Sequence, residues 1–359
     1  LLSIGALAVA VVATVVAASM VARPPAPTPP RTSEAPTERP VTLPPVAPPP
    51  AGTTYRDFIF ETEVVTAPTA TKAQSKLWYA EGAWWAGLVQ PATNRQTIFR
   101  LDWATQLWHD TGTLVDERPT ADPDFLWNGE HLYVVSAGPG SGTRHEGRVL
   151  RFSYDAAQDR FTLDRNFPVT IFPAGTTAAV ITQDSLGTLW VAYAAEQRIW
   201  LVRSLENEAN WSAPFALPAA PADVTPEDIA SVVAFGPGRI GVMWSDQLED
   251  RVYFSVHRDG DPDDAWSEPE IVIDGLGSSD DHINLKAYPD GTGTGVVAAL
   301  KTSQDQIEPV NALAPLILLA VRPADGTWST HLVSRVRDRQ TRAIVLVEHA
   351  DEPRRQRRG

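Results

Sequence analysis

The segment AVITQDSLGTLWVAYAA, at residues 179–195, sets the pattern of the whole chain. It holds two runs rich in β-branched and apolar residues with a Gly-containing turn between them, which predicts a β-hairpin. The same plan recurs in KLWYAEGAWWAGLV (76–89), DFLWNGEHLYVVSA (124–137), SVVAFGPGRIGVMWS (231–245) and INLKAYPDGTGTGVVAAL (283–300). The turn glycines are 47 to 58 residues apart: Gly82, Gly129, Gly187, Gly238 and Gly293. A hairpin unit therefore repeats about every fifty residues.

A second series of aromatic residues runs out of phase with these hairpins. It opens a later β-rich run in each unit, at Trp108, Phe161, Trp211, Trp266 and Trp328. Each unit thus offers about four strands, and four-stranded units of this length are typical of an all-β β-propeller. We expect about six blades with the last one incomplete, its inner strand at 341–348 and an outer strand at 54–66. Two stacked β-sandwiches are the alternative fold.

The repeat resembles that of the sialidase-like, BNR-repeat (Asp-box) propellers over roughly residues 55–350. The turn ADGTW (324–328) is similar to the Asp box Ser/Thr-x-Asp-x-Gly-x-Thr-Trp, shortened by one residue and without the leading Ser; DSLGTLW (184–190) is similar but lies in a first hairpin. The resemblance implies a propeller fold and a sialidase-like activity. This sequence has no Arg-Ile-Pro element and no assignable arginine triad, so the family's catalytic residues do not carry over.

Composition narrows the classes of function. The chain has 359 residues, 30 Lys+Arg against 44 Asp+Glu, a formal net charge of −14 and no Cys. An acidic chain is a poor nucleic-acid binder, because nucleic acid requires a basic footprint. The absence of Cys excludes disulfides, thiolate zinc sites and Cys nucleophiles. No cofactor motif is evident, although clustered carboxylates are compatible with Ca²⁺.

The N-terminal fifty residues differ from the rest of the chain. Residues 1–22 carry no charge, and as a helix they would extend about 33 Å, enough to cross a bilayer core. We expect a transmembrane anchor, or a signal peptide if the segment is cleaved. Residues 23–50 contain 12 of the 31 prolines, which predicts a disordered Pro-rich linker. The propeller then spans 51–350, and 351–359 form a basic tail.

Acidic residues precede several of the expected inner strands, on the side of a propeller where ligands usually bind. They are Asp122 and Asp124, Glu227 and Asp228, and Asp280 and Asp281. If the blades form a ring, these carboxylates converge on a central funnel, where they raise one another's pKa or bind a cation. Capping and solvation of turns is the structural alternative.

The stretch SSDDHINLKAYPDG (278–291) is the most unusual part of the body. Strand alternation places His282, Asn284 and Lys286 on one face. With Lys301 at the end of the next strand and Asp281 as neutralising carboxylate, they predict a polar cluster. Its functional interpretation is His282 as general acid/base with Lys holding an anionic group; its structural interpretation is a salt-bridge network that ties the fifth blade into the ring.

The sequence therefore predicts a membrane-tethered, single-pass, extracytoplasmic propeller (or a secreted one, after cleavage) that recognises a glycan or protein ligand at its acidic funnel. The ligand-binding candidates are Asn284, Lys286, Lys301, Asp280, Glu227 and Asp122. The alternative is a carbohydrate-active enzyme, a glycoside hydrolase or polysaccharide lyase, with catalytic candidates His282, Asp281, Asp124 and Asp228. A structural scaffold is the third hypothesis.

Overall fold

The computed structural model describes residues 60, 62–65, 72–138, 145–173, 175–176, 178–220, 223–290, 293–324 and 326–338. These residues belong to one structural unit, which spans 55–359. The expected anchor, linker, sixth-blade strand at 341–348 and basic tail lie outside the described residues. Within the described residues, no helix is both long and apolar enough to cross a membrane.

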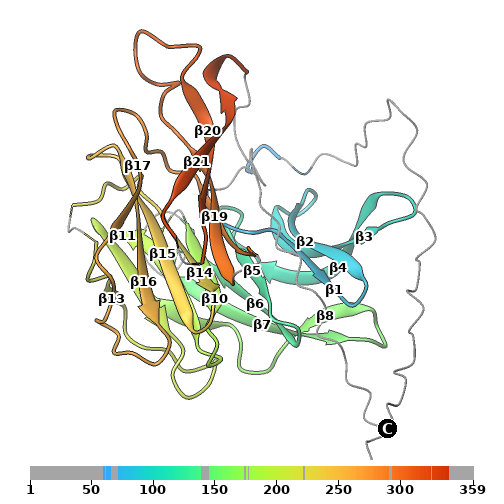
Figure 1. Ribbon diagram of the computed structural model, residues 1–359. Helices are drawn as coiled ribbons and strands as arrows, with labels where there is room; N and C mark the ends of the chain where they lie inside the picture. Colours follow the sequence, from blue (N-terminus) through green and yellow to red (C-terminus); the bar gives the residue numbers. More distant parts are fainter. Residues whose placement is uncertain are drawn as a thin grey trace, which may run out of the picture. The chain divides into compact units, whose positions relative to one another are not determined.

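The described strands form five antiparallel sheets (Figure 1). Blade 1 consists of β1 (Leu77–Ala80), β2 (Ala83–Gln90), β3 (Arg95–Asp102) and β4 (Leu107–Asp116). Blade 2 consists of β5 (Asp124–Trp127), β6 (His131–Ser136), β7 (Gly147–Asp155) and β8 (Arg160–Leu163), with β9 (Val169–Phe172) also pairing with β7. Blade 3 consists of β10 (Ala179–Gln183), β11 (Leu189–Ala195), β12 (Arg198–Arg203) and β13 (Phe215–Ala216).

The last two blades follow the same order. Blade 4 consists of β14 (Ala230–Phe235), β15 (Arg239–Asp246), β16 (Arg251–Arg258) and β17 (Glu270–Asp274). Blade 5 consists of β18 (Ile283–Pro289), β19 (Thr294–Lys301), β20 (Pro315–Arg322) and β21 (Ser329–Arg335), followed by the short 3-10 helix η1 (Val336–Asp338). All five predicted hairpins are confirmed as the two inner strands of the blades.

The inner strands follow one another around a ring. β1 lies next to β5, β5 next to β10, β10 next to β14, and β14 next to β18. The ring closes where the backbone N–H of Ile283 in β18 donates to the carbonyl of Lys72, ahead of β1, at 3.1 Å. The all-β propeller is thus confirmed. The strands of each blade come from one continuous stretch of chain.

The expectation of about six blades is wrong, because the structure has five. Blade 5 obtains all four of its strands from residues 283–335, so it requires no strand from either end of the chain. In the segment 54–66, residues 60 and 62–65 are described and none of them is in a strand.

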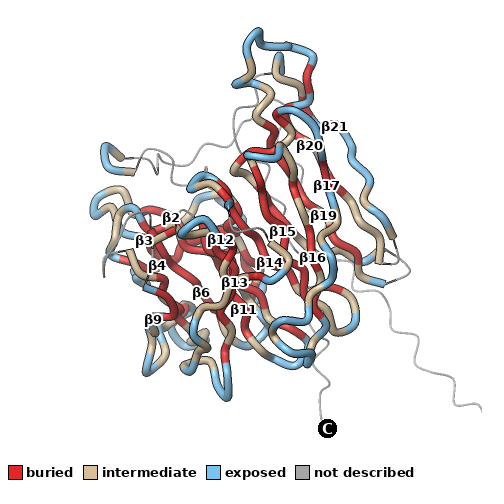
Figure 2. Tube along the Cα trace, turned by 90° about the vertical axis from the view of Figure 1, so that its left-hand side faces the viewer, coloured by how far each residue is buried: buried red, intermediate tan, exposed pale blue. Residues whose placement is uncertain are grey.

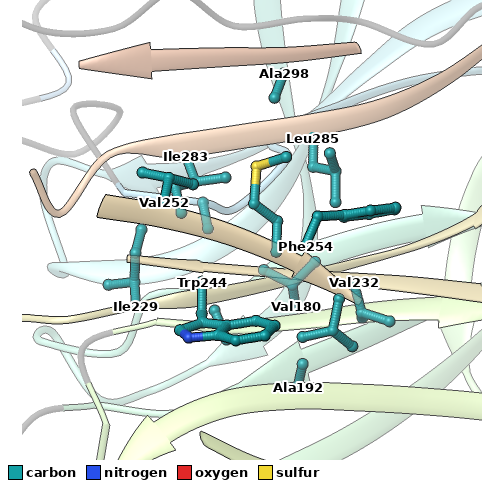
Figure 3. Packing of buried hydrophobic residues seen from close by; sticks show 14 of the residues in the cluster. Val180, Ala192, Ile229, Val232, Trp244, Val252, Phe254, Ile283, Leu285 and Ala298 are labelled. Carbon is teal, nitrogen blue, oxygen red and sulfur yellow. The ribbon is translucent and has the colours of Figure 1, made fainter. Parts of the chain in front are cut away.

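Apolar side chains pack between consecutive blades. Figure 2 marks long stretches of inner strands such as β14 and β15 as buried. One cluster joins blades 1 and 2 around Trp85 and Phe161, and a second joins blades 2 and 3 around Phe172 and Tyr193. The largest joins blades 3, 4 and 5; Figure 3 shows Trp244, Phe254, Ile283 and Leu285 packed within it. This burial stabilises the ring by about 25 cal/mol for each Å² of apolar surface removed from water.

Three of the out-of-phase aromatics pack their blade against the one before it. Phe161 of blade 2 contacts Trp85 of blade 1, with ring centroids 5.0 Å apart. Trp266 contacts Trp190 of blade 3 at 6.4 Å, and Trp328 contacts Phe254 of blade 4 at 5.2 Å. The periodicity of these residues therefore reflects packing between blades.

Candidate functional site

The inner strands begin at one end of the ring, which we call the mouth. Charged side chains from four blades meet there, and the contacts among them show that the starts of these strands lie together. We call this set the mouth cluster; it comprises Lys72, Lys76, Asp122, Asp124, Glu227, Asp280, Asp281, His282, Lys286 and Lys301. It contains nearly all the residues that the sequence analysis proposed for the funnel.

Every lysine of the chain is in the mouth cluster. The sequence has only four, Lys72, Lys76, Lys286 and Lys301, and every other strongly basic side chain is an arginine. An ammonium group is compact and has three donors pointing in different directions, so it can join carboxylates from several strands at a crowded axis. Sequence analysis overlooked Lys72 and Lys76, although the scarcity of lysine was a signal that could have identified them.

Lys72 connects the first segment of the ring with the last two blades. Its Nζ lies 2.5 Å from Oδ2 of Asp281, which precedes β18, and 3.6 Å from Oε2 of Glu227, which precedes β14. The side chains of Lys72 and Asp281 are about four-fifths buried, whereas that of Glu227 is 72% exposed. The cluster therefore reaches from the interior of the ring to its surface.

Asp280 and His282 extend this network within blade 5. His282 Nδ1 lies 2.7 Å from Oδ1 of Asp280 and 2.6 Å from Oδ1 of Asp281. Lys301 Nζ donates to Oδ2 of Asp280 at 2.6 Å and to Asp305 at 3.2 Å. Within the predicted cluster, Asp281 contacts His282 and Lys72, whereas Lys301 pairs with Asp280.

Asp124 and Asp122 connect blades 1, 2 and 3. The buried carboxylate of Asp124 accepts hydrogen bonds from the backbone N–H of Ser75 at 2.5 Å and of Ile181 at 2.9 Å. Lys76 donates to Asp122, and also to the carbonyl of Pro123 at 2.7 Å. Lys286 donates to the hydroxyl of Ser75 at 2.5 Å. Inner strands distant in sequence are thus joined through polar groups.

Burial and neighbouring positive charges shift the pKa values of the carboxyl groups in this cluster in opposite directions. Desolvation raises the pKa of Asp124 to about 6 against the attraction of Lys286, and it raises the pKa of Asp122 against that of Lys76. Burial alone would also raise the pKa of Asp281, but hydrogen bonds from His282 and Lys72 outweigh it and hold that pKa well below its ordinary value.

The two carboxylate neighbours of His282 favour its protonated form. Burial opposes its charge, yet the hydrogen bonds to Asp280 and Asp281 raise its pKa above the ordinary 6.5. Both contacts use Nδ1, and Nε2 makes no hydrogen bond within the described part of the chain. An imidazolium oriented in this way can donate its remaining proton.

The other two sequence-derived candidates, Asp228 and Asn284, are both buried. Asp228 is buried and accepts hydrogen bonds within its own blade, from Thr225, Ser245 and Gln247, so it fixes a loop instead of facing a funnel. Asn284 is buried within β18. Among the tryptophans, Trp85 and Trp244 are fully buried, and Trp127 packs against Phe161, so none of these three faces the mouth as an open ring.

Asp280, Asp281 and His282 also have the composition of a cation site. One ligand atom from each lies within 4.8 Å of the other two. Both carboxylates, however, already accept from an ammonium group, Lys301 at 2.6 Å and Lys72 at 2.5 Å. The donor set therefore suits lysine partners, and Ca²⁺ binding stays a prediction from the sequence.

No protein-family model and no curated protein matches this sequence. Among solved structures, the chain is similar to a mutant of AofleA from Arthrobotrys oligospora, with a TM-score of 0.49, 13% identity and 74% of each chain covered. It is also similar to the six-bladed aleuria aurantia lectin, a fungal lectin, with a TM-score of 0.46, 16% identity and coverage of 72% of this chain and 77% of that one.

A third similar structure is a GH43_1 enzyme from Xanthomonas citri, with a TM-score of 0.39, 10% identity and coverage of 74% and 92%. These scores are too low to carry an argument about ligand or activity. The evidence for the propeller fold is the strand order of this chain. Membership of the sialidase-like family remains a prediction.

Proposed function

We propose that this protein is a glycan-binding propeller whose ligand site is the mouth cluster. The observation that carries the proposal is the gathering of all four lysines of the chain among carboxylates from blades 2, 4 and 5. Such a site presents donors and acceptors in alternation, which matches the hydroxyl groups of a saccharide. The net charge of −14 disfavours a polyanion, so a neutral glycan fits best.

The exposed part of the cluster supplies the contacts that a ligand can reach. Glu227 is largely exposed, and Asp281 and His282 each keep about a fifth of their side-chain surface open. The ion pairs hold these groups in fixed positions before a ligand arrives, which lowers the entropy cost of binding. The same pairs also stabilise the ring, so the two roles need an experiment that separates them.

Binding of the full chain to an array of neutral and acidic glycans tests the proposal, with affinities then measured by calorimetry. We expect Asp281→Asn and Glu227→Gln each to weaken binding by about tenfold, the effect of one lost charge-assisted hydrogen bond. Asp159→Asn is the matched control, because Asp159 is exposed at the opposite end of blade 2. Folded Asp281→Asn and Glu227→Gln proteins that bind every glycan as well as the control would refute the site.

The second candidate function is acid/base catalysis by His282, favoured by its raised pKa and its free Nε2. As an imidazolium it would serve as general acid toward a glycosidic oxygen, with a mouth carboxylate as the partner base. Chromogenic neutral glycosides would reveal turnover in the wild type and its loss in His282→Gln. Equal turnover in both proteins would exclude His282 from catalysis. If neither protein shows turnover, glycan binding is the only proposed function that remains.

The membrane tether belongs to the proposal on sequence grounds only. An apolar segment at 1–22 followed by the Pro-rich stretch 23–50 suits an anchor and spacer that present the propeller outside the cytoplasm. Cell fractionation would place the full chain in the membrane and a chain lacking 1–22 in the soluble fraction. Equal distribution of the two forms would contradict an anchor.

A further inference from the structure

A groove between blades 2 and 3 lies apart from the mouth cluster. It has a volume of about 840 Å³ and shares no residue with that cluster. One wall is β9, which blade 2 adds beside β7, and the other is the loop that leads from β12 to β13 of blade 3. The lining residues on which the argument depends are Thr170, Arg203, Leu205, Glu206, Asn210 and Trp211.

The corresponding positions in the next two pairs of blades are filled. Between blades 3 and 4, Trp266 packs on Trp190, and Arg203 Nε donates to Asp263 at 2.7 Å. Between blades 4 and 5, the indole N–H of Trp328 donates to Glu270 at 2.9 Å. Trp211, the equivalent residue of blade 3, is half-buried against the apolar cluster of blades 2 and 3, but no other aromatic ring contacts it among the residues that the structure describes.

The loop that carries Trp211 is nevertheless held firmly. The indole N–H of Trp211 donates to the carbonyl of Glu208 at 2.9 Å, which fixes the orientation of the ring. The Glu208 carboxylate in turn accepts from Tyr133 and from Arg151 of blade 2, both at 3.3 Å. The groove is therefore preformed, and its aromatic wall does not need to reorganise when a ligand binds.

Polar groups with unused hydrogen-bonding capacity surround this ring. The side chains of Glu206, Asn210 and Thr170 make no hydrogen bond or ion pair within the described residues. Leu205, which is 49% exposed, adds apolar surface to the groove. Arg203 is neutralised by Asp263, so the groove carries little net positive charge. A fixed aromatic ring beside a free carboxylate, amide and hydroxyl suits a ring with an apolar face and hydroxyl edges.

We propose that the groove between β9 and the 204–212 loop is a second binding site, for one neutral saccharide ring stacked on Trp211. Asn210 and Glu206 bind its hydroxyls from the blade 3 side, and Thr170 binds from blade 2. This site does not depend on the mouth cluster, and the two sites together would make the protein bivalent for glycans.

Surface plasmon resonance with the immobilised full chain tests this site, using methyl glycosides of glucose, galactose, mannose, fucose, xylose and N-acetylglucosamine as probes. At least one glycoside should bind with millimolar affinity. Its affinity should fall about tenfold in Trp211→Ala, as expected for the loss of a stacking ring, and severalfold in the double variant Glu206→Ala/Asn210→Ala. Because both of these residues are exposed, the double variant tests the site even if Trp211→Ala does not fold.

Two controls separate this site from the mouth. Trp103→Ala removes an exposed tryptophan of blade 1 and should leave the affinity unchanged. Asp281→Asn alters only the mouth, so a glycoside whose affinity falls in Asp281→Asn and not in the double variant reports on the mouth, and the reverse pattern reports on the groove; failure of the two proposals is therefore distinguishable. The proposal is overturned if no glycoside of the panel binds, or if binding is the same in wild type and in the double variant.

Discussion

The contacts between consecutive blades differ in kind from the contact that closes the ring. From blade 1 to blade 5, each blade packs on the next through buried aromatic and aliphatic side chains. Among the described residues, the apolar cluster of blades 3, 4 and 5 reaches the first segment of the ring only through Ala73, ahead of β1. That junction is made at the mouth by a backbone hydrogen bond, an ion pair of Lys72 with Asp281 and a hydrogen bond from Lys286 to Ser75.

The junctions differ in how far they rely on charged side chains. Between the other blades, ion pairs such as Lys76 with Asp122 accompany extensive apolar packing, since a buried charge requires a partner. The closing junction relies mainly on such pairs, some of which reach the surface. The apolar junctions therefore determine the fold, while the polar junction supplies the groups that the proposed function uses.

The largest expected effect comes from an apolar junction. Phe161→Ala removes a fully buried ring that contacts Trp85 at 5.0 Å and Trp78 at 5.8 Å. We expect the free energy of unfolding to fall by about 3–5 kcal/mol, from lost burial and the cavity left behind. Urea unfolding measures it, with Leu163→Ala as a control because that residue of the same strand is exposed. Similar losses in the two variants would contradict the packing described.

The second prediction concerns the buried carboxylate that links three blades. Asp124→Ala leaves the N–H groups of Ser75 and Ile181 without their acceptor, which should cost about 1–3 kcal/mol. The wild-type pKa of Asp124 is raised to about 6, so the folded state binds a proton more tightly than the unfolded state. Its favourable contribution is complete below the unfolded pKa and is lost as pH rises through about 6.

The difference in stability between wild type and Asp124→Ala should therefore be greatest near the acid end and shrink as pH approaches neutrality. Urea unfolding at several pH values around the pKa of Asp124 measures this trend. A difference that grows with pH would show that the carboxylate is stabilised, and not penalised, by its buried position.

The third prediction tests the closing junction. Lys72→Met removes the ammonium group that pairs with Asp281 and Glu227, and the expected loss of stability is about 1 kcal/mol because both pairs are partly exposed. A double-mutant cycle with Asp281→Asn should show coupling between the two residues. Additive effects would mean that the pair does not hold the junction.

The smallest expected effect is the pH dependence due to His282. Its pKa is raised in the folded state, so the stability that it contributes is fully present below 6.5 and is lost as pH rises through the higher folded value. A titration of His282 followed by NMR should place its pKa above the ordinary 6.5. His282→Gln should flatten the decline of stability on the alkaline side; a decline of unchanged size would exclude His282 as its source.

Much of the fold was predictable from the sequence, because the signals are local. Four of the five hairpin turns have a glycine at positive φ, for example Gly82 at 77° and Gly187 at 90°, and this conformation penalises a side chain. The number of blades was not predictable, since the apolar run at 341–348 has the pattern of a strand whether or not it joins a sheet.

The site was predictable only in part. Asp281 and His282 stood out as charged residues beside an expected inner strand, and the structure brings them together. Lys72 lies ahead of the first repeat, so the repeat pattern does not include it. Lys286 contacts Ser75, 211 positions away in the sequence, and a contact over such a separation cannot be predicted from local periodicity. Asp228 had the same local pattern as Asp280, but the loop that it caps determines its partners.

The most direct test of the closing junction is a zero-length carbodiimide cross-link between Lys72 and Asp281, whose Nζ and Oδ2 atoms lie 2.5 Å apart. The reagent joins an ammonium group to a carboxylate that it contacts, as an amide formed with loss of water. Peptide mapping should show the 72–281 amide in the wild type and none in Lys72→Met. Absence of this cross-link in the folded wild-type protein would contradict a closed five-bladed ring and the mouth cluster built on it.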